Sequence, residues 1–122
     1  DFQKKQADIE LQGTGEETRA FCYVDDAVEG TIIASQKAAK SDIVHIGTDK
    51  EIKIKDLVSQ IGDVLGVRVN TKISALRAGS TPRRCPDISK LKKMGYQPKI
   101  DLNEGLKRTL EWYKQNTKLQ VA

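Results

Sequence analysis

The chain has 122 residues, which is enough for one compact domain and too few for two ordinary ones. Hydrophobic residues make up 38% of it and charged residues 31%, and 21 Lys and Arg against 17 Asp and Glu leave a formal net charge of +4. This balance excludes a disordered or fibrous chain, and no apolar run approaches the roughly 20 residues of a membrane-spanning helix.

The N-terminal residues, Asp1 to Lys5, contain no apolar stretch like the centre of a secretory signal peptide. The chain also begins with Asp1 rather than Met. We therefore expect that a further segment precedes this one in the gene product or has been removed from it.

The first predicted elements are two extended segments around a glycine turn. Side chains alternate from Ile9 to Gln12, which indicates a strand that ends at the turn Gly13–Gly15. The aromatic and apolar run from Arg19 to Val24 is also expected to be extended.

The next predicted element is a helix over residues 27–39. Asp25 and Asp26 precede it as candidate N-cap residues, with negative charge at the positive end of the helix dipole. After the helix, the apolar residues 43–46 predict a short buried strand.

The middle of the chain predicts a second helix and a second clear strand. Apolar side chains recur at helical spacing over residues 55–65, and Gly66 is the expected stop of that helix. Alternation over residues 67–73 predicts a strand, and residues 74–86 are expected to form an irregular loop.

The C-terminal third predicts two helices. A short helix over residues 88–94 is capped by Asp87, and a last helix covers residues 103–116 after a turn at Pro98. The order of elements indicates an α/β fold with short strands and three main helices. It does not indicate a doubly wound domain, because no strand leads through a glycine-rich turn into a helix.

The positive charges are scattered among acids on several segments. Only Arg77, Arg83 and Arg84 form a local cluster without a nearby acid. A solvated surface explains this distribution as well as an anionic partner does.

The two cysteines, Cys22 and Cys85, do not form a C-x-x-C motif. Only His45 is available to help them hold a metal, and structural zinc takes four ligands, so no metal site is predicted. A reduced, cytosolic setting is the simpler interpretation.

No catalytic constellation is found. His45 stands alone in an apolar segment, and Tyr96 and Lys99 are three residues apart, whereas a Tyr–Lys proton-transfer pair on one helix face is four apart. The Gly13–Gly15 turn leads into an extended run rather than a helix, so it does not predict a dinucleotide site. We expect the chain to bind rather than to react.

The arginines are the residues best suited to bind an anion. Guanidinium groups fit the fixed oxygens of a diphosphate, and Arg19, Arg83 and Arg84 are the candidates. An ion pair of Arg19 with Glu16 or Asp25, and a plain surface position for the other two arginines, explain the residues equally well.

Four stretches of sequence favour the binding interpretation. Residues 13–30 read G-T-G-E-E-T-R-A-F-C-Y-V-D-D-A-V-E-G, residues 44–48 read V-H-I-G-T and residues 83–90 read R-R-C-P-D-I-S-K. Residues 91–113 contain M-G-Y-Q-P and L-N-E-G-L, and they end in W-Y. In this order they resemble motifs of the extended short-chain dehydrogenase/reductases, the family of nucleotide-sugar epimerases, dehydratases and decarboxylases.

The resemblance implies that residues 1–122 are the C-terminal, sugar-nucleotide-binding domain of such an enzyme. In this family a Rossmann domain with a glycine-rich turn and a Tyr-x-x-x-Lys pair comes first, and no Rossmann domain is expected in this chain. NAD is then the cofactor of the full-length enzyme, held mainly by the missing domain, and none is expected for the fragment. Alone, the fragment is expected to be catalytically inert.

The resemblance also implies which residues bind substrate. Arg19 and Arg84 match the positions that contact the phosphates of the sugar nucleotide, and Arg83 is a near competitor because family loops vary by one residue there. Tyr23 is a further expected substrate-binding residue. No catalytic, cofactor-binding or metal-binding residue is expected in this chain.

Two residues depart from the family pattern. Glu17 stands where the motif often carries Gln, and an acid beside a diphosphate is unfavourable unless it points away. His45 replaces the Asn before the I-G pair. Both departures bear on the choice of base or sugar.

The expected partners are a nucleotide-diphosphate sugar, above all a UDP-sugar, and the enzyme's own N-terminal Rossmann domain. The resemblance implies a cytoplasmic, homodimeric parent without a nucleic-acid or membrane partner. Two alternatives stay open. An autonomous anion- or nucleic-acid-binding module would show steep salt dependence, and a docking or oligomerisation piece without a ligand would expose an apolar face.

Overall fold

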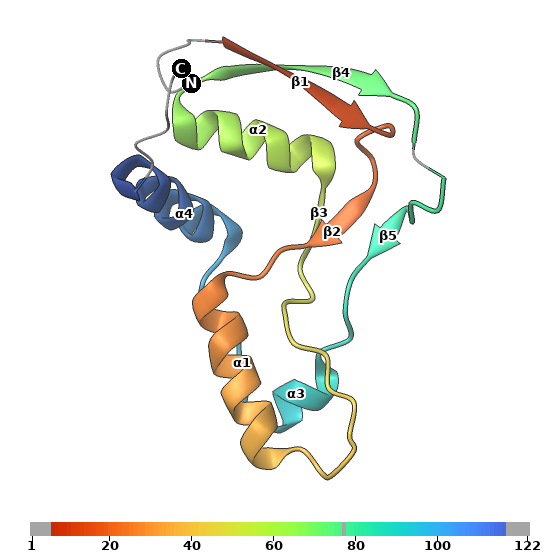
Figure 1. Ribbon diagram of the computed structural model, residues 1–122, viewed down its shortest axis with the longest axis vertical. Coiled ribbons are helices and arrows are strands. Elements are labelled where there is room, and N and C mark those ends of the chain that lie inside the picture. The colour runs from red at the N-terminus through yellow and green to blue at the C-terminus, as the bar shows by residue number, and fades with distance from the viewer. Residues whose placement is uncertain (1–5, 77, 117–122) are drawn as a thin grey trace.

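The computed structural model describes residues 6–76 and 78–116. Within these ranges the chain forms short strands in two small sheets, together with helices (Figure 1). The strands are β1 (Gln6–Gln12), β2 (Thr18–Ala20), β3 (Glu51–Lys53), β4 (Arg68–Ser74) and β5 (Arg83–Arg84). The helices are α1 (Val24–Lys37), α2 (Ile54–Leu65), α3 (Ser89–Lys93) and α4 (Leu102–Asn116).

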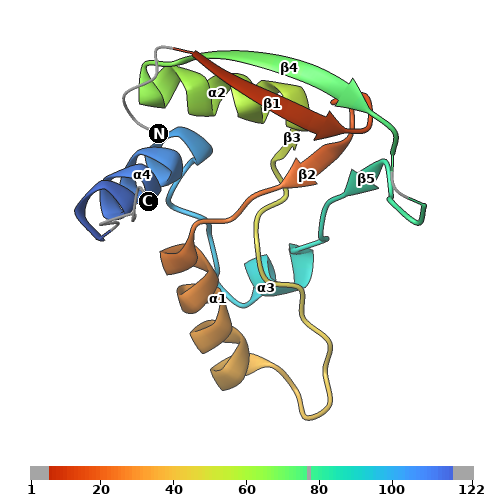
Figure 2. The same ribbon diagram turned by 45° about the horizontal axis from the view of Figure 1, so that its top comes forward.

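One end of the molecule is a layer of α2 against the two-stranded sheet β1–β4 (Figures 1 and 2). The two strands are parallel, and Leu11 of β1 and Val58 of α2 are buried. A Cβ atom on Gly62 would lie 2.8 Å from Val69 Cγ2, so the absent side chain lets α2 approach β4 closely. Gly66 ends the helix in the left-handed region, as its position in the sequence predicts.

The other end is built around three buried side chains, those of Ile88, Leu91 and Tyr96. The side chain of Ile33 on α1 packs against them, which joins α1 to α3. The Tyr96 hydroxyl donates a hydrogen bond of 2.9 Å to the carbonyl of Gly47, and burial raises the pKa of this hydroxyl.

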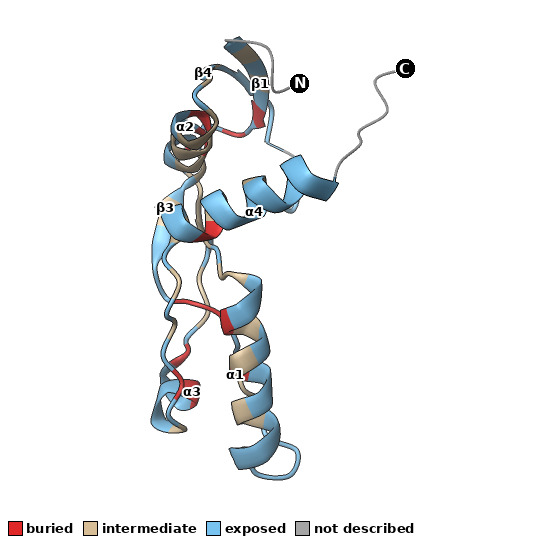
Figure 3. Cartoon of the chain, turned by 90° about the vertical axis from the view of Figure 1, so that its left-hand side faces the viewer, coloured by how far each residue is buried: buried red, intermediate tan, exposed pale blue. Residues whose placement is uncertain are grey.

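Few side chains are fully buried for a chain of this length. The buried hydrophobic residues of the described part are Leu11, Val58, Ile88, Leu91 and Tyr96. Figure 3 shows buried residues in small separate groups along a narrow molecule. On α1, by contrast, the side chains of Val24, Val28 and Ile32 are 60%, 52% and 51% exposed. Their spacing of four residues makes them one apolar stripe, called the α1 stripe below.

The helix start at Asp25 and Asp26 differs from the prediction. Tyr23 is the N-cap of α1, so the two acids lie in its first turn. Asp26 is 2% exposed, and its carboxylate accepts hydrogen bonds from the amides of Lys99 and Ile100, at 3.0 and 2.9 Å. The N-cap prediction was therefore wrong, because the side chain satisfies backbone donors that are distant in sequence.

The predicted extended segments are also corrected in part. Residues 43–46 form no strand with any other described residue, and Ile43 is 79% exposed. The extended run after Arg19 is a strand only as far as Ala20, while the loop 74–86 contains the short strand β5. The described part contains no helix with the length and apolarity needed to cross a membrane.

Candidate anion-binding site

The pairing of β2 with β5 brings two predicted site residues together. The strands run parallel, and Arg19 and Arg84 are direct partners in the register, as are Thr18 and Arg83. Partner residues project to the same face of a sheet, and successive residues project to opposite faces. Arg19 and Arg84 therefore share one face of the β3–β2–β5 sheet, and Arg83 lies on the other.

On the face that carries Arg83, the guanidinium group forms an ion pair with Glu51. Arg83 Nε donates to both carboxylate oxygens of Glu51 at 3.0 Å, and the Thr18 hydroxyl donates to Glu51 at 2.7 Å. This arginine holds the pKa of Glu51 below its ordinary value, and Glu51 raises the pKa of Arg83. The positive charge of Arg83 is thus already neutralised within the chain.

A second ion-pair group adjoins this face. The Glu16 carboxylate lies 2.7 Å from Lys53 Nζ and also pairs with Lys55. The two ammonium groups lower the pKa of Glu16 to about 2. Asp25 lies 3.7 Å from Arg108. Neither acid that the sequence offered as a partner of Arg19 therefore pairs with it.

The hydrogen bonds of the other two arginines go to neutral oxygens. Arg19 donates to the carbonyl of Thr18 at 2.6 Å and to that of Thr81 at 2.9 Å, and Arg84 Nε donates to the Thr81 hydroxyl at 2.8 Å. Arg19 is half-buried and Arg84 is exposed. The two guanidinium groups thus converge on Thr81 with their charge unneutralised by any described carboxylate. Sequence reasoning missed Thr81, and no sequence signal marks it.

The Gly13–Gly15 turn is occupied by a side chain of the protein. Glu17 accepts hydrogen bonds from the amides of Thr14 and Gly15, at 3.0 and 2.9 Å, and these donors lower its pKa. The turn leads into β2 rather than into a helix. These residues therefore do not fit the pyrophosphate of NAD, because Rossmann folds bind that pyrophosphate at a helix N-terminus.

The structure places Tyr23 against α4. A Cβ atom on Gly105 would lie 3.2 Å from Tyr23 Cδ2, and the Arg108 guanidinium carbon lies 5.7 Å from the centre of the tyrosine ring. These contacts give Tyr23 a packing role between α1 and α4. Substrate binding by Tyr23 stays a prediction.

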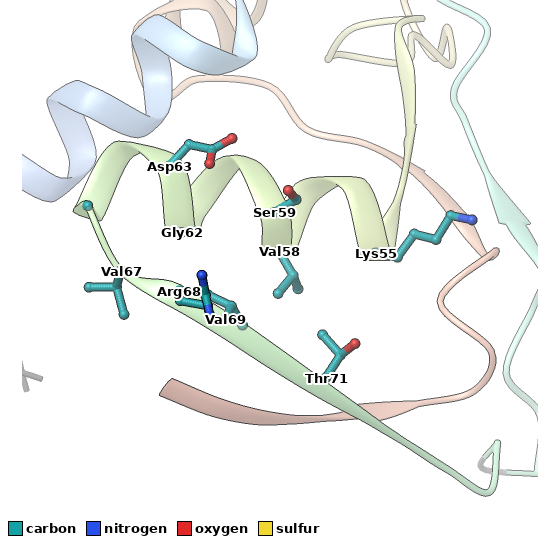
Figure 4. A pocket seen from close by; sticks show the side chains of 10 residues that line it. Lys55, Val58, Ser59, Gly62, Asp63, Val67, Arg68, Val69 and Thr71 are labelled. Carbon is teal, nitrogen blue, oxygen red and sulfur yellow. The ribbon is translucent and has the colours of Figure 1, made fainter. Parts of the chain in front are cut away.

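One hollow of the surface lies away from the arginine face. It measures about 570 Å³, and its lining comes from α2 and from the stretch of β4 that faces it, including Lys55, Asp63 and Arg68 (Figure 4). Val58 points from α2 toward β4 across its floor (Figure 4). None of the predicted site residues lines it, and its charges are mixed, so it does not compete with the arginine face as an anion site.

Comparisons with known proteins agree on one group of enzymes. A family model described as GDP-mannose 4,6 dehydratase matches residues 2–109. The chain is 33% identical over 110 residues to a probable GDP-L-fucose synthase 1 of Oryza sativa, covering 90% of this chain and 34% of that protein.

Solved structures of related enzymes share the fold. The UDP-glucose 4-epimerase of Thermotoga maritima, solved with UDP-glucose, matches with a TM-score of 0.81 at 27% identity and covers 88% of this chain and 35% of that one. A UDP-glucuronic acid 4-epimerase from Bacillus cereus, in complex with UDP-glucuronic acid and NAD, matches with a TM-score of 0.79 at 27% identity. The match covers 87% of this chain and 35% of that one. The chain thus spans about a third of the length of these relatives.

Proposed function

The chain belongs to the extended short-chain dehydrogenase/reductase family, and on this premise we propose that it binds the diphosphate of a nucleotide sugar. The observation that carries the proposal is the register of β2 and β5, which sets Arg19 beside Arg84. Their hydrogen bonds to neutral oxygens leave both cations available to an anionic ligand. The ion pair of Arg83 with Glu51 argues against this role for Arg83.

The fold expected from the order of the predicted elements, a small α/β domain with short strands and three main helices, is confirmed. The activity of the whole protein follows as a proposal: an NAD-dependent epimerase, dehydratase or decarboxylase acting on a nucleotide sugar. NAD would be held mainly by a Rossmann domain outside this chain, where it would accept and return a hydride. The residues of this chain would hold the substrate, and the chain alone would be inert. A homodimeric, cytoplasmic parent remains a prediction from the resemblance.

The proposal predicts a preference for diphosphates. In the protein at its natural length, calorimetric titration should show that UDP binds about tenfold or more tightly than UMP, because UMP lacks one of the two phosphates that the arginines contact. UDP-sugars of different hexoses should share this diphosphate-dependent part of the affinity.

Equal affinities for UDP, UMP and uridine would contradict the proposal. The nucleic-acid alternative makes the opposite prediction, which is tight binding of a generic oligonucleotide with a steep loss of affinity in salt. Such a result without diphosphate preference would favour that alternative.

The α1 stripe supports the second proposed partner, a Rossmann domain of the same polypeptide. Val24, Val28 and Ile32 are exposed on one side of α1, while Ile33 on the other side packs into the buried cluster. The unpaired apolar residues 43–46, with Ile43 exposed, add extended backbone that lacks a strand partner in the described part. An apolar helix face that the described part leaves exposed is a surface that a partner domain would cover.

Val28→Lys tests this surface. In the protein at its natural length it is expected to lower Tm by about 5 °C or more, because the lysine would be buried against the partner domain. The matched control is Ser59→Lys, at an exposed position of α2, which should change Tm by less than about 1 °C. Equal Tm values for the two variants, measured by calorimetry, would show that nothing covers the α1 stripe.

A further inference from the structure

The turn that precedes β2 is a junction between several elements. The Gly13 amide donates to the carbonyl of Ser74 at the end of β4, and the Lys55 amide at the start of α2 donates to the carbonyl of Gly15, both at 3.0 Å. The turn therefore joins the β1–β4 layer to α2. A movement of the turn would therefore displace both the β1–β4 layer and the start of α2.

The same junction positions the strand that carries Arg19. The Ile54 amide donates to the carbonyl of Glu17, and the Thr18 amide donates to the carbonyl of Pro82 just before β5, both at 2.9 Å. The start of β2 is thus held between α2 and the segment that leads to Arg84. The relative placement of the two arginines depends on these bonds.

The carboxylate of Glu17 holds the turn from inside. It accepts from two successive amides, those of Thr14 and Gly15, and from the Thr14 hydroxyl at 3.3 Å. Successive amides in a tight turn form a concave anion site, and here the anion is part of the chain. Gly13 has φ of +106°, and a Cβ atom there would lie 2.4 Å from Glu17 Oε1, so the carboxylate packs directly on the turn.

This arrangement resolves how an acid can stand two residues before Arg19. Backbone amides neutralise part of the Glu17 charge and hold its carboxylate in the turn. The amides of Thr14 and Gly15 are consequently unavailable to a phosphate of a ligand. The turn supplies geometry to the site, and the arginines supply its charge.

We propose that Glu17 is a positioning residue, whose carboxylate fixes the Gly13–Gly15 turn and thereby sets Arg19 beside Arg84 for a diphosphate. The inference rests on the proposed function and adds to it. It assigns this acid a role opposite to the repulsion expected for a carboxylate that faces the ligand.

The test combines two measurements on the protein at its natural length, amide exchange of Thr14 and Gly15 by NMR and the affinities for UDP and UMP. Glu17→Ala should speed exchange at both amides and weaken UDP binding about tenfold, with a smaller effect on UMP. Glu17→Gln keeps one carbonyl oxygen as acceptor, so its UDP affinity should fall between those of the wild type and Glu17→Ala. It also keeps the assay usable if the alanine variant does not fold.

Glu16→Ala is the matched control, because Glu16 pairs with Lys53 and Lys55 instead of the turn. It should leave the exchange of both amides and the ratio of UDP to UMP affinity within about twofold of the wild type.

Three results would overturn the inference. Tighter UDP binding by Glu17→Gln would mean that the acid repels the ligand. Unchanged amide exchange of Thr14 and Gly15 in Glu17→Ala would mean that the carboxylate does not fix the turn. A loss of UDP affinity in Arg19→Ala but not in Glu17→Ala would refute the positioning role alone, whereas unchanged UDP affinity in Arg19→Ala would refute the proposed function itself.

Discussion

Replacement of Arg19 by alanine is expected to weaken UDP binding roughly fiftyfold in the protein at its natural length. The half-buried guanidinium has two donors in contact with neutral carbonyls, so a diphosphate gains charge-assisted hydrogen bonds that no described carboxylate contests. Arg84→Ala should cost less, about tenfold, because the exposed side chain is better screened by solvent. Calorimetric titration with UDP measures both.

The control for this prediction is the neighbouring arginine. Arg83 lies on the opposite face of the sheet in an ion pair with Glu51, so Arg83→Ala should change UDP affinity by less than about threefold. Arg77, from the same local cluster in the sequence, lies outside the described residues. A larger loss in Arg77→Ala than in Arg84→Ala would contradict the assignment of the second phosphate contact to Arg84.

Replacement of Asp26 by alanine is expected to lower the free energy of unfolding by about 3 kcal/mol. Its buried carboxylate accepts from the amides of Lys99 and Ile100, and truncation leaves two amide donors without their partner. Urea unfolding followed by circular dichroism measures the loss.

Asp25→Ala separates this effect from the loss of an acid in the first turn of α1. Asp25 is exposed and lies 3.7 Å from Arg108, so the variant should cost less than about 1 kcal/mol. Similar losses in the two variants would mean that Asp26 acts through the helix dipole and not through the distant amides.

The helices were largely predictable from local patterns. The apolar spacing over residues 55–65 and Gly66 match α2, and the last helix lies within one residue of its prediction. The predicted cap of α3 was wrong by one residue, because Ile88 is its N-cap and Asp87 precedes it, although the Asp87 carboxylate does accept from the Ser89 amide at 2.9 Å. Apolar spacing and helix-stop residues act within a few residues of the chain, so helices can be predicted from a single sequence.

The failures concern contacts between distant segments. Asp26 reads as a cap because acids favour helix starts, and nothing near it in the sequence indicates the amides of Lys99 and Ile100. Residues 43–46 have the composition of a buried strand, but a strand also needs a neighbour, and the described part supplies none. Composition predicts the tendency to form a strand and not its partner.

The sequence indicated which residues are candidates for the site, but it did not indicate how they are placed relative to one another. The motifs point to Arg19 and Arg84, while Arg83 remained a competitor in the sequence because the loop length is ambiguous by one residue. The register of β5 against β2 and the ion pair with Glu51 separate the two arginines, and both involve pairings more than thirty residues apart. A shift of one residue in such a register moves a side chain to the other face.

A crystal structure of the protein at its natural length with UDP-glucose tests the central claim most directly. We expect diphosphate oxygens within about 3 Å of the guanidinium groups of Arg19 and Arg84, on the sheet face away from Glu51. A diphosphate bound on the face of Arg83, or one that contacts neither Arg19 nor Arg84, would contradict the account.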